Sequence, residues 1–293
     1  MKFQRIITLL ILCIAVFSLV ATTAGIFSNE GPGPYEHTSV RGETVLIYGN
    51  GIYQHMSAEV APQGIAQDVV TMFLGIPLLL IGLYLSQKGS LRGRILLAGT
   101  LGYFLVTYLF YLVMGMFNKM YLVYVILLST SFFAFFLTIL SFNIGNLSSS
   151  FNRKTPIRFV GGFLIFNTLA IALLWLQIVV PPLLKGAIPL EVEHYTTLIV
   201  QGLDLSILLP LAFLSGALLI KKRPLGYLMA PVYIVFLSIL MTALTAKVIA
   251  MNGGLPVIII IPLFNLLAIL CSVLILKNIN DQVHRDIGNS RWI

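Results

Sequence analysis

Three ionisable side chains, Asp68, Asp204 and Lys247, lie within long apolar stretches of the sequence. A charged side chain in membrane hydrocarbon costs about 2.5–3.5 kcal/mol on insertion scales, so such residues usually face protein or water and often mark a site. One glutamine lies directly beside the first carboxylate, and another lies three residues before the second. The candidate ligand-binding residues are therefore Asp68, Asp204, Gln67, Gln201 and Lys247. Two carboxylates in one cavity of low dielectric constant favour a cation or a shared proton as ligand.

Each of these residues also has a structural explanation. Asp68 lies on a helical face with small residues, which suits close helix packing, and it would then bond a neighbouring helix. Asp204, about 10 Å from the end of its stretch at 1.5 Å per residue, fits equally well with a buried structural hydrogen bond. Lys247 lies close to the end of its stretch, from which its ammonium can extend to the membrane surface. Both interpretations of the three residues stay open.

Neutral polar residues recur at helical spacing within other apolar stretches. Most are of the kind that bonds helix to helix, and together they indicate either a polar cavity or a well-bonded core. The clearest rows are Gly99, Tyr103, Thr107, Tyr111 and Gly115, then Tyr124, Ser131 and Thr138, then Asn265 and Ser272.

The motifs of several enzyme classes are missing from the sequence. It contains no phosphate-binding Gly-x-x-x-x-Gly-Lys-Ser/Thr loop, no His-Glu-x-x-His or Cys-x-x-Cys metal motif and no Gly-x-Ser-x-Gly elbow. No motif therefore implies a catalytic residue, a metal or a cofactor. An alternative is a membrane enzyme that acts on a lipid or quinone at the outer face. Its candidate residues would be Asp68, His55, Glu59, Glu193 and His194.

Composition identifies the class of protein that carries these residues. Of the 293 residues, 58% are hydrophobic and 10% are charged, against about 45–50% and about 25% in soluble domains. Disorder is excluded by the high hydrophobicity. A disulfide scaffold is excluded because Cys13 and Cys271 are the only cysteines. The sequence predicts an all-α integral membrane protein.

Apolar stretches of about 20 residues predict eight transmembrane helices. Continuous apolar runs favour helices over strands, which would alternate. The predicted spans are Ile6–Phe27, Ile65–Ser86, Ile95–Phe117, Tyr121–Phe142, Ile157–Val180, Thr197–Ile220, Leu225–Ala250 and Leu255–Leu276. The first span has an alternative: Lys2 and Arg5 before an apolar run, with Ala21 to Ala24 after it, are also typical of a cleaved signal peptide.

The distribution of basic residues predicts the orientation. With the N-terminus in the cytoplasm, 14 of the 18 lysines and arginines fall in cytoplasmic segments, as the positive-inside rule requires. Six glutamates fall on the outside. Both termini are expected in the cytoplasm and the protein in the plasma membrane. The net charge of +8 then reflects topology and attraction to anionic lipid, and no nucleic-acid partner is expected.

The chain divides into two halves around a polar linker. The predicted segments are a first four-helix half at 1–142 with an outer loop at 28–64, a linker at 143–156, a second half at 157–276 and a tail at 277–293. The second and sixth spans each carry an aspartate, a proline (Pro77 or Pro210) and, eleven residues later, a lysine (Lys88 or Lys221). This pattern predicts a parallel four-plus-four repeat. The alternative is that any two helices with a proline and a basic inner end look alike.

These observations lead to two main hypotheses of function. In the first, the protein is a transporter or a membrane protein that binds a cation or small molecule in the outer half of the bilayer, with Asp68 and Asp204 in the site. In the second, it is a non-catalytic scaffold, sensor or assembly subunit. The second predicts that both aspartates are structurally bonded. The sequence does not identify a substrate, a protein partner or an oligomeric state.

Overall fold

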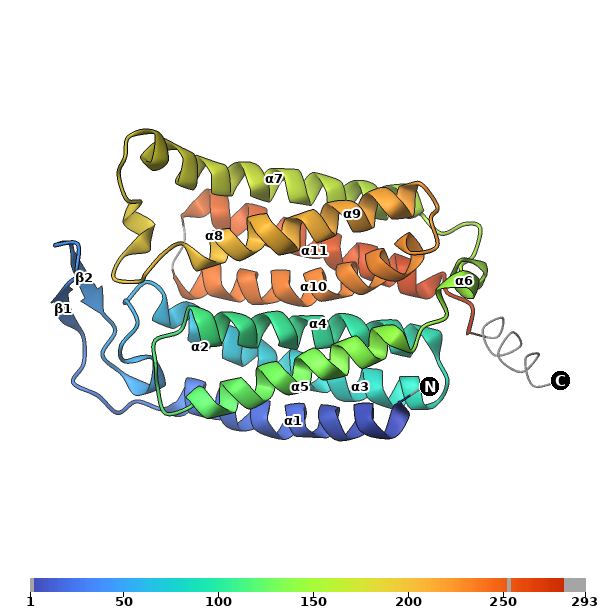
Figure 1. Ribbon diagram of the computed structural model, residues 1–293, viewed down its shortest axis with the longest axis horizontal. Coiled ribbons are helices and arrows are strands. Elements are labelled where there is room, and N and C mark those ends of the chain that lie inside the picture. Colours follow the sequence, from blue (N-terminus) through green and yellow to red (C-terminus); the bar gives the residue numbers. More distant parts are fainter. Residues whose placement is uncertain (1–2, 252–253, 282–293) are drawn as a thin grey trace.

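The computed structural model describes residues 3–251 and 254–281. Within them, eight helices are long and apolar enough to cross a membrane. This confirms the number of predicted spans, and their ends differ from the prediction by at most four residues. The fold is that of an all-α, multi-pass membrane protein. Figure 1 shows the spans side by side along the long axis of the molecule.

Six spans are single helices and two are interrupted. The single helices are α1 (Gln4–Phe27), α4 (Leu91–Val113), α5 (Tyr121–Leu140), α7 (Ile157–Leu184), α10 (Gly226–Ala250) and α11 (Leu255–Lys277). The second span consists of α2 (Ala61–Val70), the π-helical turn η2 (Thr71–Gly75) and α3 (Ile76–Gln87). The sixth consists of α8 (Ile199–Leu203), the π-helical turn η5 (Asp204–Leu208) and α9 (Leu209–Ile220).

The connections contain short elements. In the outer loop these are the antiparallel hairpin of β1 (Tyr35–Thr38) and β2 (Thr44–Ile47), followed by η1 (Gly51–Tyr53). The linker holds α6 (Ile144–Leu147) and η3 (Ser148–Ser150), and the loop before α8 holds η4 (Leu190–Val192). The hairpin lies at one end of the bundle, and α6 with the start of α1 lies at the other (Figure 1).

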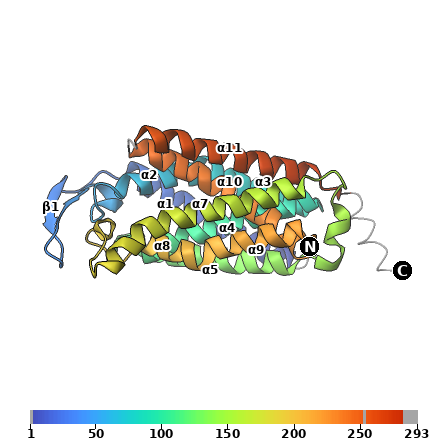
Figure 2. The same ribbon diagram turned by 90° about the horizontal axis from the view of Figure 1, so that it is seen from above.

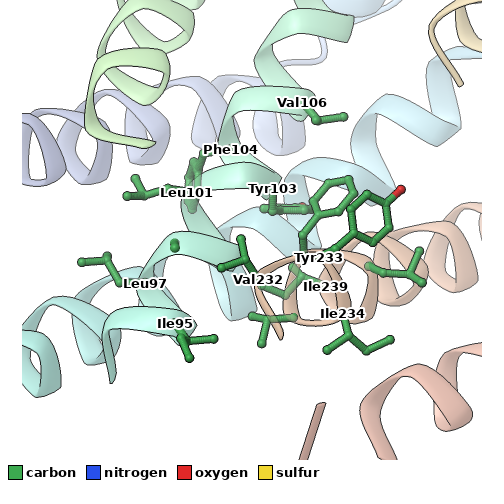
Figure 3. Close-up of a cluster of buried hydrophobic side chains, with 14 of the residues drawn as sticks. Ile95, Leu97, Leu101, Tyr103, Phe104, Val106, Val232, Tyr233, Ile234 and Ile239 are labelled. Atoms are coloured by element: carbon green, nitrogen blue, oxygen red, sulfur yellow. The ribbon is translucent and has the colours of Figure 1, made fainter. Parts of the chain in front are cut away.

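The helices α4 and α10 pack against each other at the centre of the bundle. They are the most buried spans. Both helices carry buried apolar side chains, among them Leu101 and Phe104 on α4 and Ile234 on α10 (Figure 3). A Cβ added to Gly99 would lie only 2.8 Å from the carbonyl oxygen of Val232. A glycine at this position therefore lets the two backbones approach closely.

The helix α4 begins four residues before the predicted start because polar groups cap it. The Ser90 side chain accepts a hydrogen bond from the Gly93 amide at 3.1 Å. The Asp281 carboxylate accepts from the amides of Leu91 and Arg92 at 2.8 and 3.2 Å. The first turn of a helix has amides without partners, and an acidic acceptor stabilises it. Hydropathy does not detect this turn because it is polar.

Each of the two interrupted spans contains a π-helical turn that ends two residues before a proline. The turn Thr71–Gly75 precedes Pro77, and the turn Asp204–Leu208 precedes Pro210. Proline lacks an amide hydrogen and crowds the carbonyl four residues earlier. A widened turn relieves that crowding, and π-helical turns are frequent at functional sites.

The same two spans end in similar turns. A Cβ added to Gly93, after the first turn, would overlap Leu85. A Cβ added to Gly226, after the second, would overlap Leu218. The distance along the sequence from Gly93 to Gly226 equals that from Leu85 to Leu218. The same distance separates Pro77 from Pro210.

Candidate functional site

The carboxylate of Asp68 is buried where three helices and the outer loop meet. It is 1% exposed. The Tyr53 hydroxyl, from η1, donates to its Oδ2 at 2.5 Å. The Tyr111 hydroxyl, from α4, donates to its Oδ1 at 2.9 Å. On the α1 side, a Cβ added to Gly25 would overlap Oδ2, so only a glycine leaves room for this carboxylate.

The phenol of Tyr53 lies outside the apolar spans and remains a hydrogen-bond donor. Its ring is 4% exposed, and burial raises its pKa well above the usual value. The hydroxyl therefore keeps its proton at neutral pH and donates it to the carboxylate.

Next to Asp68, the side chain of Gln67 joins α2 to α4. Its Nε2 donates to the Tyr103 hydroxyl at 2.8 Å and to Thr107 Oγ1 at 3.0 Å. The Thr71 hydroxyl donates to the Gln67 carbonyl at 2.8 Å and lies 2.7 Å from the Tyr103 hydroxyl. The predicted polar row of α4 thus faces the predicted polar face of the second span.

Several buried polar atoms near Asp68 form no hydrogen bond within 3.5 Å to another described residue. They are Gln67 Oε1 and the hydroxyls of Tyr108 and Tyr124. The rings of Tyr108 and Tyr124 contact that of Tyr111, with centroids 5.8 and 5.2 Å away. Buried polar groups are nearly always bonded, so unpaired ones indicate a place for water, an ion or a ligand.

The other two predicted site residues lie in the second half. Asp204 is half-buried at the start of η5, and the indole of Trp175, on α7, donates to its Oδ2 at 2.8 Å. Lys247, on α10, is half-buried and interacts electrostatically with both Asp204 and Asp68. Among the described residues it forms no ion pair within 4.0 Å. The half-buried Gln201 lies one turn before Asp204, and no hydrogen bond of its side chain is found in the described part of the chain.

Asp68 and Asp204 therefore have different environments. In the sequence, Asp204 lies deeper in its predicted span than Asp68 does, which predicts that Asp204 is the costlier carboxylate. Accessible surface instead shows Asp68 to be the more buried of the two. Asp68 accepts two side-chain hydrogen bonds and Asp204 accepts one.

The outer loops of the two halves contact each other. Arg41, beyond the end of β1, donates to the carbonyls of Glu193 and Tyr195 at 2.6 and 2.7 Å. His194 Nε2 lies 3.0 Å from the carbonyl of His55. Burial raises the pKa of Glu193 and lowers that of His194. We call these contacts of Arg41, His55 and residues 193–195 the loop clasp.

The loop clasp contains the histidines proposed for an outer-face enzyme, but His55 and Glu59 are exposed. No group of three or more histidine, cysteine or acidic residues able to hold a metal is found in the described part of the chain.

Sequence reasoning missed three residues of the Asp68 and Asp204 environments. Tyr53 lies in the outer loop, where no periodicity marks it, and Gly25 gives no chemical signal. Trp175 is one of only two tryptophans, and a tryptophan within a span is the one signal that could have drawn attention to it.

The fold defines a multi-pass helical membrane protein that buries one carboxylate, Asp68, within a span. No protein-family model, curated protein or solved structure matches the chain.

Proposed function

We propose that the protein is a proton- or cation-binding membrane protein of the transporter type, with Asp68 at the centre of its site. One observation carries the proposal. Asp68 is a buried carboxylate in a span, held by two tyrosines. Nearby, Gln67 Oε1 and the hydroxyls of Tyr108 and Tyr124 form no hydrogen bond within 3.5 Å to another described residue. A buried charge is costly unless it is compensated. A proton or small cation would compensate Asp68, and the unpaired atoms would bind the cation or its water.

The proposed site continues to Lys247 and Asp204. Lys247 interacts electrostatically with both carboxylates, which belong to different halves of the chain. One positive charge then balances one carboxylate, and the second carboxylate is free to bind a proton or a cation. Gln67 and Gln201 would supply amide oxygens to the same ligand.

We also propose that the chain is a parallel repeat of two four-helix units, α1–α5 and α7–α11. The matched π-helical turns, prolines and terminal turns of the second and sixth spans support this proposal. Interrupted spans at corresponding positions in two repeats are a sequence signature of transporter binding sites. When the two units are aligned so that Pro77 matches Pro210, Asp204 corresponds to Thr71 and Asp68 corresponds to Gln201.

Ion flux into proteoliposomes tests the function. Purified protein is reconstituted around a pH-sensitive dye, and gradients of Na⁺, K⁺ or protons are imposed in turn. We expect a cation-dependent pH change that Asp68→Asn abolishes and the exposed-hairpin control Glu36→Gln retains, with rates normalised to folded protein. The absence of any wild-type flux, or full activity of folded Asp68→Asn protein, would overturn the proposal.

A scaffold or assembly role is the second candidate function. It is favoured by the hydrogen bonds that both aspartates accept from protein donors. In that case Asp204→Asn and Asp68→Asn change thermal stability in detergent, and any activity follows the amount of folded protein.

A further inference from the structure

A basic cavity lies at the end of the bundle that also holds α6. Its volume is about 760 Å³. Its walls come from the linker, the first turn of α7, the turn between α9 and α10, and the first turn of α10. The lining residues that matter here are Arg153, Arg158, Phe159, Lys222 and Tyr227. The Tyr227 ring packs on that of Phe151, with centroids 5.1 Å apart, and this contact joins the linker to α10.

The charge of this basic cavity is uncompensated. Arg153, Arg158 and Lys222 line it, and no acidic residue of the described part of the chain does. None of the three forms an ion pair with another described residue. The first turn of α7 holds no acidic residue and no side-chain cap. A helix N-terminus carries partial positive charge, so three cations around it repel it unless an anion lies between them.

Lys222 occupies a backbone position that disfavours a lysine. Its φ is 54°, in the left-handed region. The corresponding turn between α3 and α4 has Gly89 at φ 80°, a residue for which that region is unstrained. A strained residue that persists where glycine would fit points to a function for its side chain.

The walls of the cavity are part basic and part apolar. Phe159 is 48% exposed, and it lies next to Arg158 at the start of α7. Farther along α7, Phe166 and Leu173 are also exposed, so this helix presents an apolar face at the periphery of the bundle. An inorganic anion would contact only the basic part of the wall. A lipid would contact both the basic and the apolar part, with its phosphate among the cations and its acyl chains along α7.

We propose that this basic cavity binds the phosphate group of an anionic lipid from the adjoining leaflet. With the predicted orientation, that leaflet is the cytoplasmic one, where anionic lipids attract juxtamembrane basic residues. The site is separate from Asp68 and does not depend on the transport proposal.

Native mass spectrometry of the full chain in detergent micelles tests the proposal. The probes are phosphatidylglycerol and the zwitterionic phosphatidylcholine. We expect one tightly bound phosphatidylglycerol, and about 30-fold weaker binding in the double variant Arg158→Gln/Lys222→Gln, because two cations near a membrane contribute on that order. The matched control Lys154→Gln/Lys221→Gln removes two charges from the same segments, but neither residue lines the cavity. It should keep most of the affinity.

Equal losses in the two double variants would mean diffuse surface attraction and would overturn the proposal, as would equal wild-type affinity for the two lipids. If millimolar inorganic phosphate displaces phosphatidylglycerol, the phosphate site stands but a lipid as its occupant is rejected. Should the cavity variant fail to fold, Lys222→Gly removes one charge and relieves the strained turn. It should bind phosphatidylglycerol about fivefold more weakly while folding normally.

Discussion

Asp68 and Asp204 show how neighbouring groups give one residue type two different roles. Two tyrosine hydroxyls bind the carboxylate of Asp68, one on each oxygen, and its surroundings exclude solvent. Asp204 is half-buried and binds one indole. An amide side chain replaces a carboxylate well where one acceptor oxygen suffices and poorly where both oxygens accept hydrogen bonds.

We therefore expect Asp68→Asn to destabilise the protein more than Asp204→Asn. At position 68 the amide nitrogen replaces one acceptor oxygen, so the Tyr111 hydroxyl must turn its proton from the carboxylate to the Gly64 carbonyl, 3.0 Å away. A hydrogen bond to a charged group, worth about 1.5–3 kcal/mol, is then lost. At position 204 the amide oxygen can still accept from Trp175. Thermal unfolding of both variants in one detergent measures the difference, and a reversed order would contradict the assignment of donors.

The absence of a side chain at Gly25 is a second requirement of the Asp68 site. Gly25→Ala places a methyl group on the Asp68 carboxylate, and we expect a loss of about 1–3 kcal/mol, as for other overpacked cores. Gly162→Ala is the matched control, because this helical glycine of α7 has open space where its Cβ would lie. Comparison of unfolding midpoints checks the prediction. Similar values for the two variants would show that α1 does not pack on Asp68 as described.

Among the described elements outside the spans, the loop clasp contains a histidine contact whose charge can change with pH. His194 is half-buried, and burial lowers its pKa, with the charges of His37 and Arg41 acting in the same direction. A neutral His194 is thus favoured in the docked loop. The loop clasp joins loops of the two halves. A stronger clasp therefore restricts the movement of one half relative to the other at that end.

We expect the loop clasp to loosen as the pH falls through about 6.5, the ordinary pKa of histidine. Below that value a detached loop takes up a proton that the docked loop resists, so the stability contributed by His194 is lost with falling pH. The raised pKa of Glu193 acts with the opposite sign. Hydrogen exchange of the loop amides, corrected for intrinsic rates, measures docking between pH 7.5 and 5.5.

His194→Gln is the control for this titration. It retains Glu193 and a side chain able to bond the carbonyl of His55 but removes the titrating imidazole. A pH dependence that persists unchanged in this variant would assign the effect to another group.

The orientation of the whole molecule follows from its two dissimilar ends. The linker and the basic α9–α10 turn lie at one end, and the hairpin with the loop clasp lies at the other (Figure 2 gives the second view). The basic end is expected in the cytoplasm. In a cysteine-free background, single cysteines at Ser149 and Lys185, which are both exposed, should react with a membrane-impermeant maleimide from opposite sides. Labelling from one side would refute the eight-span orientation.

Much of the fold followed from the sequence, because a membrane span needs about 20 apolar residues and this requirement is local. The eight spans were predicted on that basis and lie close to their observed positions. The helical spacing of Tyr103, Thr107 and Tyr111 likewise placed them on one face of α4. Hydropathy failed where polar groups extend a helix, as at the Asp281 cap of α4.

The partners of the buried carboxylate were decided by tertiary structure. Nothing in the local sequence brings Tyr53, from an irregular loop, or Gly25, from the end of α1, to Asp68. Those contacts form when helices distant in sequence pack together, and packing depends on the shapes of several surfaces at once. For the same reason the sequence identified Asp68 and Asp204 as unusual but ranked Asp204 as the costlier of the two, whereas Asp68 is the more buried, since burial is a property of the neighbours that each carboxylate meets.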